Sequence, residues 1–252
     1  MSNKKKEKAL KLVVLLFLSF VSAIIIFMSF SLISAADPQG PDELSIISNE
    51  TKGAVSSKMV NISGGRIATL TLNATIQNPR WKAFVGNVTG KFTLDDASGS
   101  TIYDWTLSSI TGRVYSTRTS GSVTWENINC SNVTTLEQEN INMNHTNPDD
   151  NLTATFNTSE GATHQAFYVG SVYIPANTCP TLNLYRNNAS DDNHWEEIAL
   201  YDGNYIVYAS IIEDDEIGFD GKTYDFQMIV PENGLPSFQG ATAYYLYLEI
   251  GT

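Results

Sequence analysis

The feature that most constrains the fold is a long uncharged run near the N-terminus. Five lysines precede it, and no charged residue occurs between Lys11 and Asp37. As a helix, the 25 residues 12–36 would span roughly 37 Å, which is enough to cross a hydrocarbon core of about 30 Å. The flanking lysines predict that this end stays in the cytoplasm and that the rest of the chain is exported.

Two interpretations of this hydrophobic helix remain open. Ser34, Ala35 and Ala36 supply the small residues that a signal peptidase recognises, which predicts a signal peptide over residues 1–36. The run is longer than the usual secretory segment, so a retained signal anchor that attaches the protein to the membrane is the alternative. Both interpretations predict a location outside the cell or on its surface.

The charge of the chain excludes one class of partner. The whole sequence carries a formal charge of −12, and removal of residues 1–36, with five Lys and one Glu, makes it −16. A charge of this sign repels phosphate backbones, so nucleic acid is not expected to bind.

The two cysteines, Cys130 and Cys179, are expected to form a disulfide, because an exported chain folds in an oxidising environment. In the chain-entropy model, closing a loop of about 50 residues stabilises the folded state by roughly 4 kcal/mol. Two thiols this far apart in the sequence do not by themselves indicate a zinc or redox site.

Most of the exported part has the pattern of short β-strands. Residues 37–54 are polar and contain Pro and Gly, so they are expected to be a linker that precedes one domain over residues 55–252. In residues 67–77, Leu70, Leu72 and Ile76 alternate with polar residues, which predicts a strand with one buried face. Further strands are expected at 81–88, 91–94, 101–107, 111–119, 166–174, 198–212, 223–230 and 241–250.

Only residues 132–143 favour a short helix, since an Asn precedes good helix formers there. The sequence therefore predicts an all-β fold, an antiparallel β-sandwich of the jelly-roll or immunoglobulin-like type, with one short helical insertion. Residues 81–88 are apolar on both faces, as in a central strand. Residues 91–107 are expected to form a hairpin with Tyr103, Trp105 and Leu107 packed inward.

The sequence contains more N-glycosylation triplets than its composition explains. A shuffled chain with 22 Asn and 48 Ser plus Thr would contain about four, whereas this one contains ten. The asparagines are Asn49, Asn61, Asn73, Asn87, Asn129, Asn132, Asn144, Asn151, Asn157 and Asn188. The strand pattern turns Asn73 and Asn61 toward solvent, where a glycan must lie. A polar β-surface that carries few glycans is the alternative interpretation.

No motif for a catalytic centre is recognisable. His145, His164 and His194 lack the spacing of metal ligands, and neither a nucleophile motif nor a phosphate-binding glycine loop occurs. We therefore do not expect an enzyme or a bound cofactor. Calcium is the one ion considered, because the loop 213–221 places Asp214, Asp215, Glu216 and Asp220 close together. Solvated turn residues are the alternative.

The strand with Asn73, the stretch "RWKAFVGNVTGKFTLDDASGSTIYDW" and the ending "TAYYLYLEI" together resemble an uncharacterised family of exported archaeal cell-surface glycoproteins. The resemblance covers residues 59–125 and about the last thirty residues, and it implies a location and no activity. We therefore expect a secreted or cell-surface glycoprotein with a structural or adhesive function, such as a surface-layer or filament subunit. Its partners would be further copies or other surface proteins. A carbohydrate- or Ca²⁺-dependent binding module is the alternative.

Overall fold

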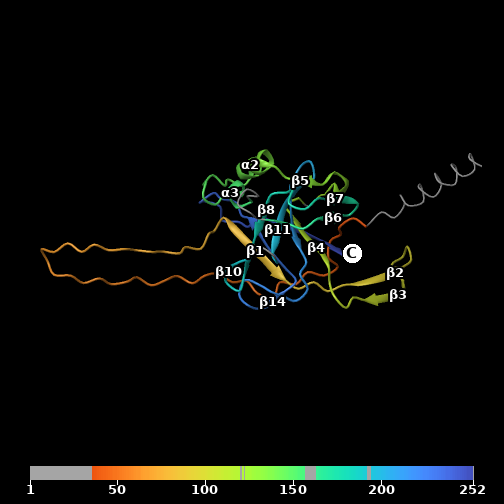
Figure 1. Cartoon of the computed structure of the whole chain (residues 1–252), viewed down its shortest axis with the longest axis horizontal. Helices are drawn as coiled ribbons and strands as arrows, with labels where there is room; N and C mark the ends of the chain where they lie inside the picture. Colours follow the sequence, from red (N-terminus) through yellow and green to blue (C-terminus); the bar gives the residue numbers. More distant parts are fainter. Residues whose placement is uncertain (1–35, 120, 122, 157–162, 192–193, 252) are drawn as a thin grey trace, which may run out of the picture. The chain divides into compact units, whose positions relative to one another are not determined.

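A computed structural model describes residues 36–119, 121, 123–156, 163–191 and 194–251. The expected hydrophobic helix over residues 12–36 lies outside this range, except for Ala36. From Pro38 to Thr252 the chain forms one unit, which is shown in Figure 1.

The strands among the described residues are short, and all of their pairs are antiparallel. In chain order they are β1 (Trp81–Gly86), β2 (Lys91–Asp95), β3 (Thr101–Thr106), β4 (Gly112–Thr117), β5 (Asn129–Cys130), β6 (Phe167–Val169), β7 (Val172–Ile174), β8 (Thr181–Asn183), β9 (Tyr185–Arg186), β10 (Ala189–Ser190), β11 (Glu196–Tyr201), β12 (Ile206–Ile211), β13 (Glu216–Ile217), β14 (Thr223–Tyr224), β15 (Phe226–Pro231) and β16 (Tyr245–Ile250). The helices are η2 (Trp125–Asn127), α2 (Val133–Asn142) and α3 (Leu152–Thr155). The all-β prediction is confirmed for the described part of the chain.

Strands β11 and β12 form the centre of the largest sheet, and nearly all of their residues are buried. Their apolar composition suits a position with layers on both faces. The turn between them is built by Asp202, whose carboxylate accepts hydrogen bonds from the backbone N–H groups of Asn204 and Tyr205. Gly203, with φ of 99°, supplies the left-handed conformation that this turn needs.

The largest sheet has the order β16-β4-β12-β11-β5, and β8 also pairs with β11. Strands β5 and β8 follow one another along the same edge of β11, where Cys130 lies opposite Leu200 and Thr181 opposite Ile198. The predicted Cys130–Cys179 disulfide is present and joins β5 to the residues just before β8. It therefore holds two short strands on one edge of β11.

Both faces of this sheet are covered. On one face, Ile198, Leu200 and Val207 pack with residues of η2, β6 and β7. On the other face, Ala199 and Tyr208 pack with residues of α2, α3 and β15. Alternate residues of β11 and β12 thus point to opposite apolar clusters, as the pleat of a strand requires.

Strands β1 and β15 form a two-stranded ribbon over the second face. Two hydrogen bonds join β15 to the sheet below it: Glu197 Oε2 accepts from Ile229 N at 2.8 Å, and Ser210 Oγ donates to Gln227 O at 2.8 Å. This ribbon is a smaller second layer than a jelly roll or an immunoglobulin-like domain has.

The expected helix is confirmed as α2. Asn132 caps it, because its side chain accepts a hydrogen bond from Thr135 N while Thr135 Oγ1 accepts one from Asn132 N. The helix is also held by its buried Glu139, which pairs with Arg118 through two hydrogen bonds of 2.7 and 2.6 Å.

Three expectations about individual strands are wrong. Residues 67–77 form no strand, and Leu70, Leu72 and Ile76 are exposed. Strand β1 lies at an edge, with β15 as its one partner strand among the described residues, although its sequence is typical of a central strand. The expected hairpin is present as β2 and β3, but Tyr103 and Trp105 are 61% and 49% exposed, and only Leu107 is half-buried.

Replacing Glu197 with Gln is expected to remove a loss of stability that the native protein shows as the pH rises. Burial raises the pKa of Glu197 well above its ordinary value of 4.5, although the hydrogen bond from Ile229 opposes this. The folded state therefore holds the carboxyl proton of Glu197 more tightly than the unfolded state does. Stability is lost as the pH rises above 4.5, because the unfolded state then releases this proton first. Each unit by which the pKa is raised corresponds to about 1.4 kcal/mol in the free energy of unfolding.

The Gln variant lacks this loss, so its free energy of unfolding should fall less between pH 5 and pH 8 than that of the native protein. Denaturant titrations at pH 5 and pH 8 measure the difference. Glu137→Gln on the exposed face of α2 is the control. An equal pH dependence of the Glu197→Gln and native proteins would contradict the assignment.

Candidate interaction site

The most unusual part of the structure is residues 40–77, which we call the exposed segment. Every residue in it is exposed, and none belongs to a strand or helix. Its first part runs past β14, where the charge of Glu50 acts on Tyr224, and the rest extends from the folded part as two legs that run alongside one another and turn back near Gly64 and Gly65 (Figure 1). Lys52 Nζ donates a hydrogen bond of 3.0 Å to Thr75 O and so joins the legs at one point. On the N-terminal side of the segment, Gln39 pairs with Leu248 of β16, so residues 40–77 connect two parts of the chain that both contact the fold.

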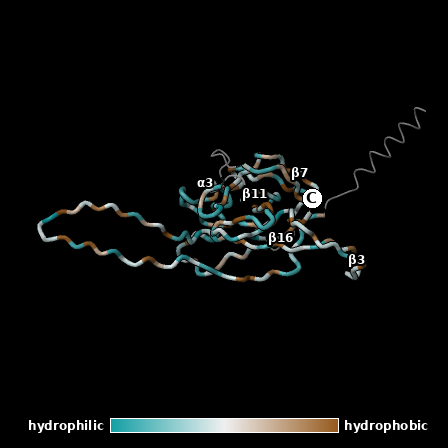
Figure 2. The backbone as a smooth tube through the Cα atoms, turned by 60° about the horizontal axis from the view of Figure 1, so that its bottom comes forward, coloured by the Kyte–Doolittle hydropathy of each residue, from teal (hydrophilic) through white to brown (hydrophobic). Residues whose placement is uncertain are grey.

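Large apolar side chains occur along both legs of the exposed segment, as the hydropathy colours of Figure 2 show. They are Leu44, Ile46, Ile47, Val55, Met59, Val60, Ile62, Ile67, Leu70, Leu72 and Ile76. Leu72 and Ile76 are 86% and 85% exposed. Single apolar residues are common on protein surfaces, but contiguous ones usually mark a contact with another molecule.

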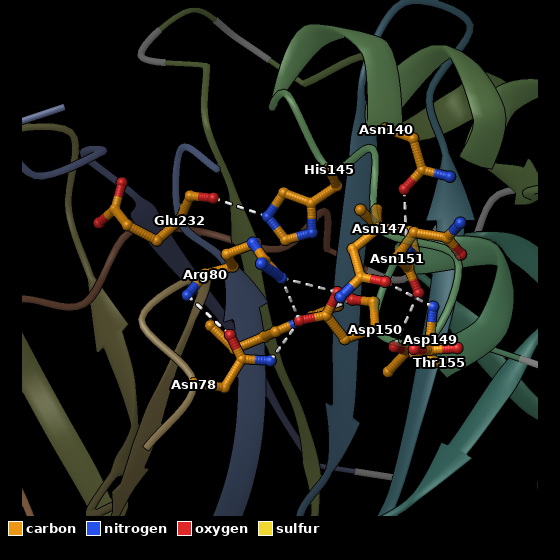
Figure 3. A network of polar contacts seen from close by, with 12 residues as sticks. Asn78, Arg80, Asn140, His145, Asn147, Asp149, Asp150, Asn151, Thr155 and Glu232 are labelled. Atoms are coloured by element: carbon orange, nitrogen blue, oxygen red, sulfur yellow. Dashed lines mark hydrogen bonds and ion pairs between the residues drawn. The ribbon is translucent and has the colours of Figure 1, made fainter. Parts of the chain in front are cut away.

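The end of the exposed segment is fixed to the domain by Asp150, in the loop before α3. The Asp150 carboxylate accepts hydrogen bonds from Arg80 Nη1 at 3.0 and 2.7 Å and from Asn78 Nδ2 at 2.6 Å (Figure 3). Trp81 Nε1 donates to the backbone oxygen of Asp150 at 2.8 Å, and Asn78 Oδ1 accepts from Arg80 N. We call these contacts the Asp150 network.

A second set of contacts continues this network toward β15. His145 packs edge-on against Trp81, with ring centroids 5.4 Å apart, and its Nε2 lies 2.7 Å from Glu232 O. The Glu232 carboxylate in turn pairs with Lys82 of β1 at 2.8 Å and accepts hydrogen bonds from Thr242. Burial opposes ionisation, but these hydrogen bonds prevail and lower the pKa of Glu232 to about 2. The start of β1 is therefore held from both sides.

A second exposed apolar surface lies on the β2–β3 hairpin. The register places Phe92 opposite Trp105 and Leu94 opposite Tyr103, so these four side chains share one face. All four are exposed, and the Tyr103 and Trp105 rings contact each other edge-on at 4.9 Å. An isolated two-stranded hairpin is marginally stable in water, so this face is also available for a partner.

The predicted glycosylation sites fall into three groups. Seven asparagines are exposed: Asn49, Asn61, Asn73, Asn87, Asn129, Asn132 and Asn188. Asn144 and Asn151 are half-buried, and Asn157 lies outside the described residues. Asn49, Asn61 and Asn73 lie on the exposed segment, where the whole triplet is accessible. Near Asn129, by contrast, Ser131 is buried and donates a hydrogen bond to Ala199 O.

The four carboxylates considered for calcium have different partners. Asp214 accepts from Ile110 N, Glu216 pairs with Arg186, and Asp220 accepts from Lys222 and Tyr224. Asp215 has a φ of 55° and donates its N–H to Asp225. Among the described residues, no group of three or more His, Cys, Asp or Glu side chains lies close enough to hold a metal ion.

The histidines are placed as structural residues. His164 is buried, and because its Nδ1 lies 2.8 Å from Gln165 O, its Nε2 accepts from the N–H groups of Thr178 and Cys179. Burial lowers the pKa of His164, which favours this neutral form. His194 contacts Asp191 at 3.1 Å. Nearby, burial and then the charge of Glu213 raise the pKa of Glu196 to about 7.

In comparisons with protein-family models, curated proteins and solved structures, no match to this chain was found. None of the helices among the described residues is long and apolar enough to cross a membrane.

Replacing Asp150 with Ala is expected to release the start of β1. The variant loses the ion pair with Arg80 and the hydrogen bond from Asn78, so its free energy of unfolding should fall by about 1–3 kcal/mol. Trypsin should then cut after Arg80, a site that the network protects. Limited proteolysis followed by mass analysis of the fragments measures this.

Asp149→Ala is the matched control, because Asp149 is the exposed neighbour of Asp150. It should retain the stability and the cleavage pattern of the native protein. Identical patterns for the two variants would show that the Asp150 network does not hold this part of the chain.

Proposed function

We propose that the protein is an exported, N-glycosylated structural protein of the cell surface whose copies associate into a surface layer or filament. The observation that carries this proposal is the exposed segment, because its apolar side chains remain in water in a single copy. A chain that keeps such a segment in its folded state is suited to contact other molecules.

Export is supported by the N-terminal sequence and by the disulfide. The lysine-flanked run over residues 12–36 has the composition of a signal peptide or signal anchor. The Cys130–Cys179 bridge suits an oxidising environment outside the cytoplasm. If the N-terminal run is retained, it attaches each copy to the membrane. If it is removed, attachment depends on contacts between copies or with other surface proteins.

Glycosylation is supported by the accessibility of most triplets. The asparagines on the exposed segment can be modified in the folded protein, because no part of these triplets is buried. The triplet at Asn129 would have to be modified before folding, since Ser131 is buried in the native state. Glycans and acidic side chains together would keep a protein with so much exposed apolar surface soluble.

A carbohydrate-binding module is a second candidate, favoured by the exposed rings of Tyr103 and Trp105. Aromatic faces beside polar groups are a common way to hold sugars. The edge-on packing of these two rings presents no continuous flat platform, which is why we place this function second. Titration of the purified protein with cell-wall oligosaccharides, and of the Trp105→Ala variant as control, would distinguish it.

Native protein isolated from its own cells should lose mass on deglycosylation. We expect the intact mass to fall by several glycans, with peptides containing Asn49, Asn61 and Asn73 among those modified, because these sites are fully exposed. Asn204, which is not part of a triplet, should be unmodified and serves as the internal control. Equal masses before and after treatment would refute the glycoprotein proposal.

A further inference from the structure

Residues 67–77 have the features of a strand that lacks a neighbouring strand. Leu70, Leu72 and Ile76 form one row and alternate with polar residues, and no residue in this stretch carries a charge or is proline. The apolar row is exposed along its length. A stretch of this kind pairs readily with any open sheet edge that it meets.

We propose that residues 67–77 of one copy add as a strand to the open edge of β1 in a second copy. This inference rests on the proposed function, since it names the contact by which copies would associate. It assigns the exposed segment as the donor and the β1–β15 ribbon as the acceptor.

The Asp150 network is the reason that the donor does not cover β1 of its own copy. Residues 67–77 lead directly into Asn78, Pro79 and Arg80, and the side chains of Asn78 and Arg80 are both bound to Asp150. These contacts direct the chain away from β1 at the point where a hairpin would have to form (Figures 1 and 3). The contact between the two legs of the exposed segment, from Lys52 to Thr75, also keeps the donor apart from the domain.

Strand β1 offers unpaired backbone groups on its open edge. Glu232 N donates to Arg80 O, so Arg80, Lys82 and Phe84 are the positions whose backbone groups face β15 in this antiparallel register. The N–H and C=O groups of Ala83 and Val85 therefore point to the open edge. Natural edge strands are usually protected by charged residues or proline. Here the side chains of Ala83 and Val85 are exposed and apolar, and Lys82 is bound to Glu232.

The sheet beneath this open edge has an apolar surface that is incompletely covered. Strand β15 lies over β11 and β12, to which it is hydrogen-bonded. Phe84 of β1 packs in the same cluster as Leu246, Leu248 and Ile250 of β16, so β1 lies on the β16 side of β15. These side chains are only half-buried. A third strand beside β1 would lie above them and cover them with its apolar row.

The polar row of the donor suits the outer face of such an added strand. Thr69, Thr71 and Asn73 would point away from the sheet when Leu70 and Leu72 point toward it. A glycan on Asn73 would then remain in solvent. The lack of charge in residues 67–77 also allows the donor to approach a second copy although both copies are strongly acidic.

Charged substitutions in the two rows of the donor test the proposal. We expect the double variant Leu70→Asp, Leu72→Asp to raise the dissociation constant for self-association of the full-length protein at least about a hundredfold. Thr69→Asp with Thr71→Asp adds the same charge to the same stretch on the other row and should associate like the native protein. Sedimentation velocity and negative-stain electron microscopy measure the assemblies. Thermal unfolding should be unchanged for each separate copy, because all four positions are exposed.

The outcomes separate this inference from the proposed function. A native protein that stays monomeric at every concentration would refute both. A native protein that assembles while the two double variants assemble equally well would refute the donor and leave the proposed function intact. Loss of assembly in the Leu70 and Leu72 variant alone supports the donor.

Hydrogen exchange in the assembled state identifies the acceptor. Amide exchange in a peptide that covers Ala83 and Val85 should slow about tenfold or more on assembly, because these N–H groups gain a partner. The Leu70 and Leu72 double variant should show no such protection. Protection that appears only in the β2–β3 hairpin would place the acceptor there and refute the assignment to β1.

Discussion

The contacts of Asp150 fix the point at which the chain returns from the exposed segment to the compact part of the protein. One carboxylate binds Asn78 and Arg80, and the backbone oxygen of the same residue binds Trp81. Through Trp81 and His145 these contacts reach Glu232, so the start of β1 and the end of β15 are held together. Residues 40–77 are exposed, and just before them Gln39 pairs with Leu248 of β16 through two backbone hydrogen bonds. The position of the β1–β15 ribbon and the direction of the exposed segment both depend on this one acidic residue.

The consequence of this arrangement is an apolar surface that a single copy does not bury. Covering one Leu or Ile side chain contributes about 1.5–3 kcal/mol, so covering Leu70, Leu72 and Ile76 together would contribute several times that amount. In a single copy this contribution is absent, and no strand among the described residues pairs with the open edge of β1. If residues 67–77 of one copy paired with β1 of another, this one contact would cover the apolar side chains and give the edge of β1 a partner strand. The strongly acidic surface and the proposed glycans would act in the opposite direction, because they limit non-specific association.

The local structure was largely predictable from the sequence, whereas the partners of the strands were not. Helix α2 and the β2–β3 hairpin follow from a capping residue and from turn composition, which act over short distances. The disulfide was predictable because the chain has only two cysteines. The alternation in residues 67–77 identifies a surface that can be half-buried, but it does not say which molecule covers it. The same holds for Tyr103 and Trp105, whose apolar face is exposed. Asp150 could not be recognised because its partners Asn78 and Arg80 are distant in sequence and no motif links them.

The most direct test is an electron cryomicroscopy map of assemblies taken from the native cell surface. It should show a third strand beside β1, continuous with the exposed segment of a neighbouring copy, with Leu70 and Leu72 facing β16 and Asn73 facing solvent. A map in which the edge of β1 is bare, or is covered by residues 67–77 of the same copy, would contradict the proposed strand exchange between copies.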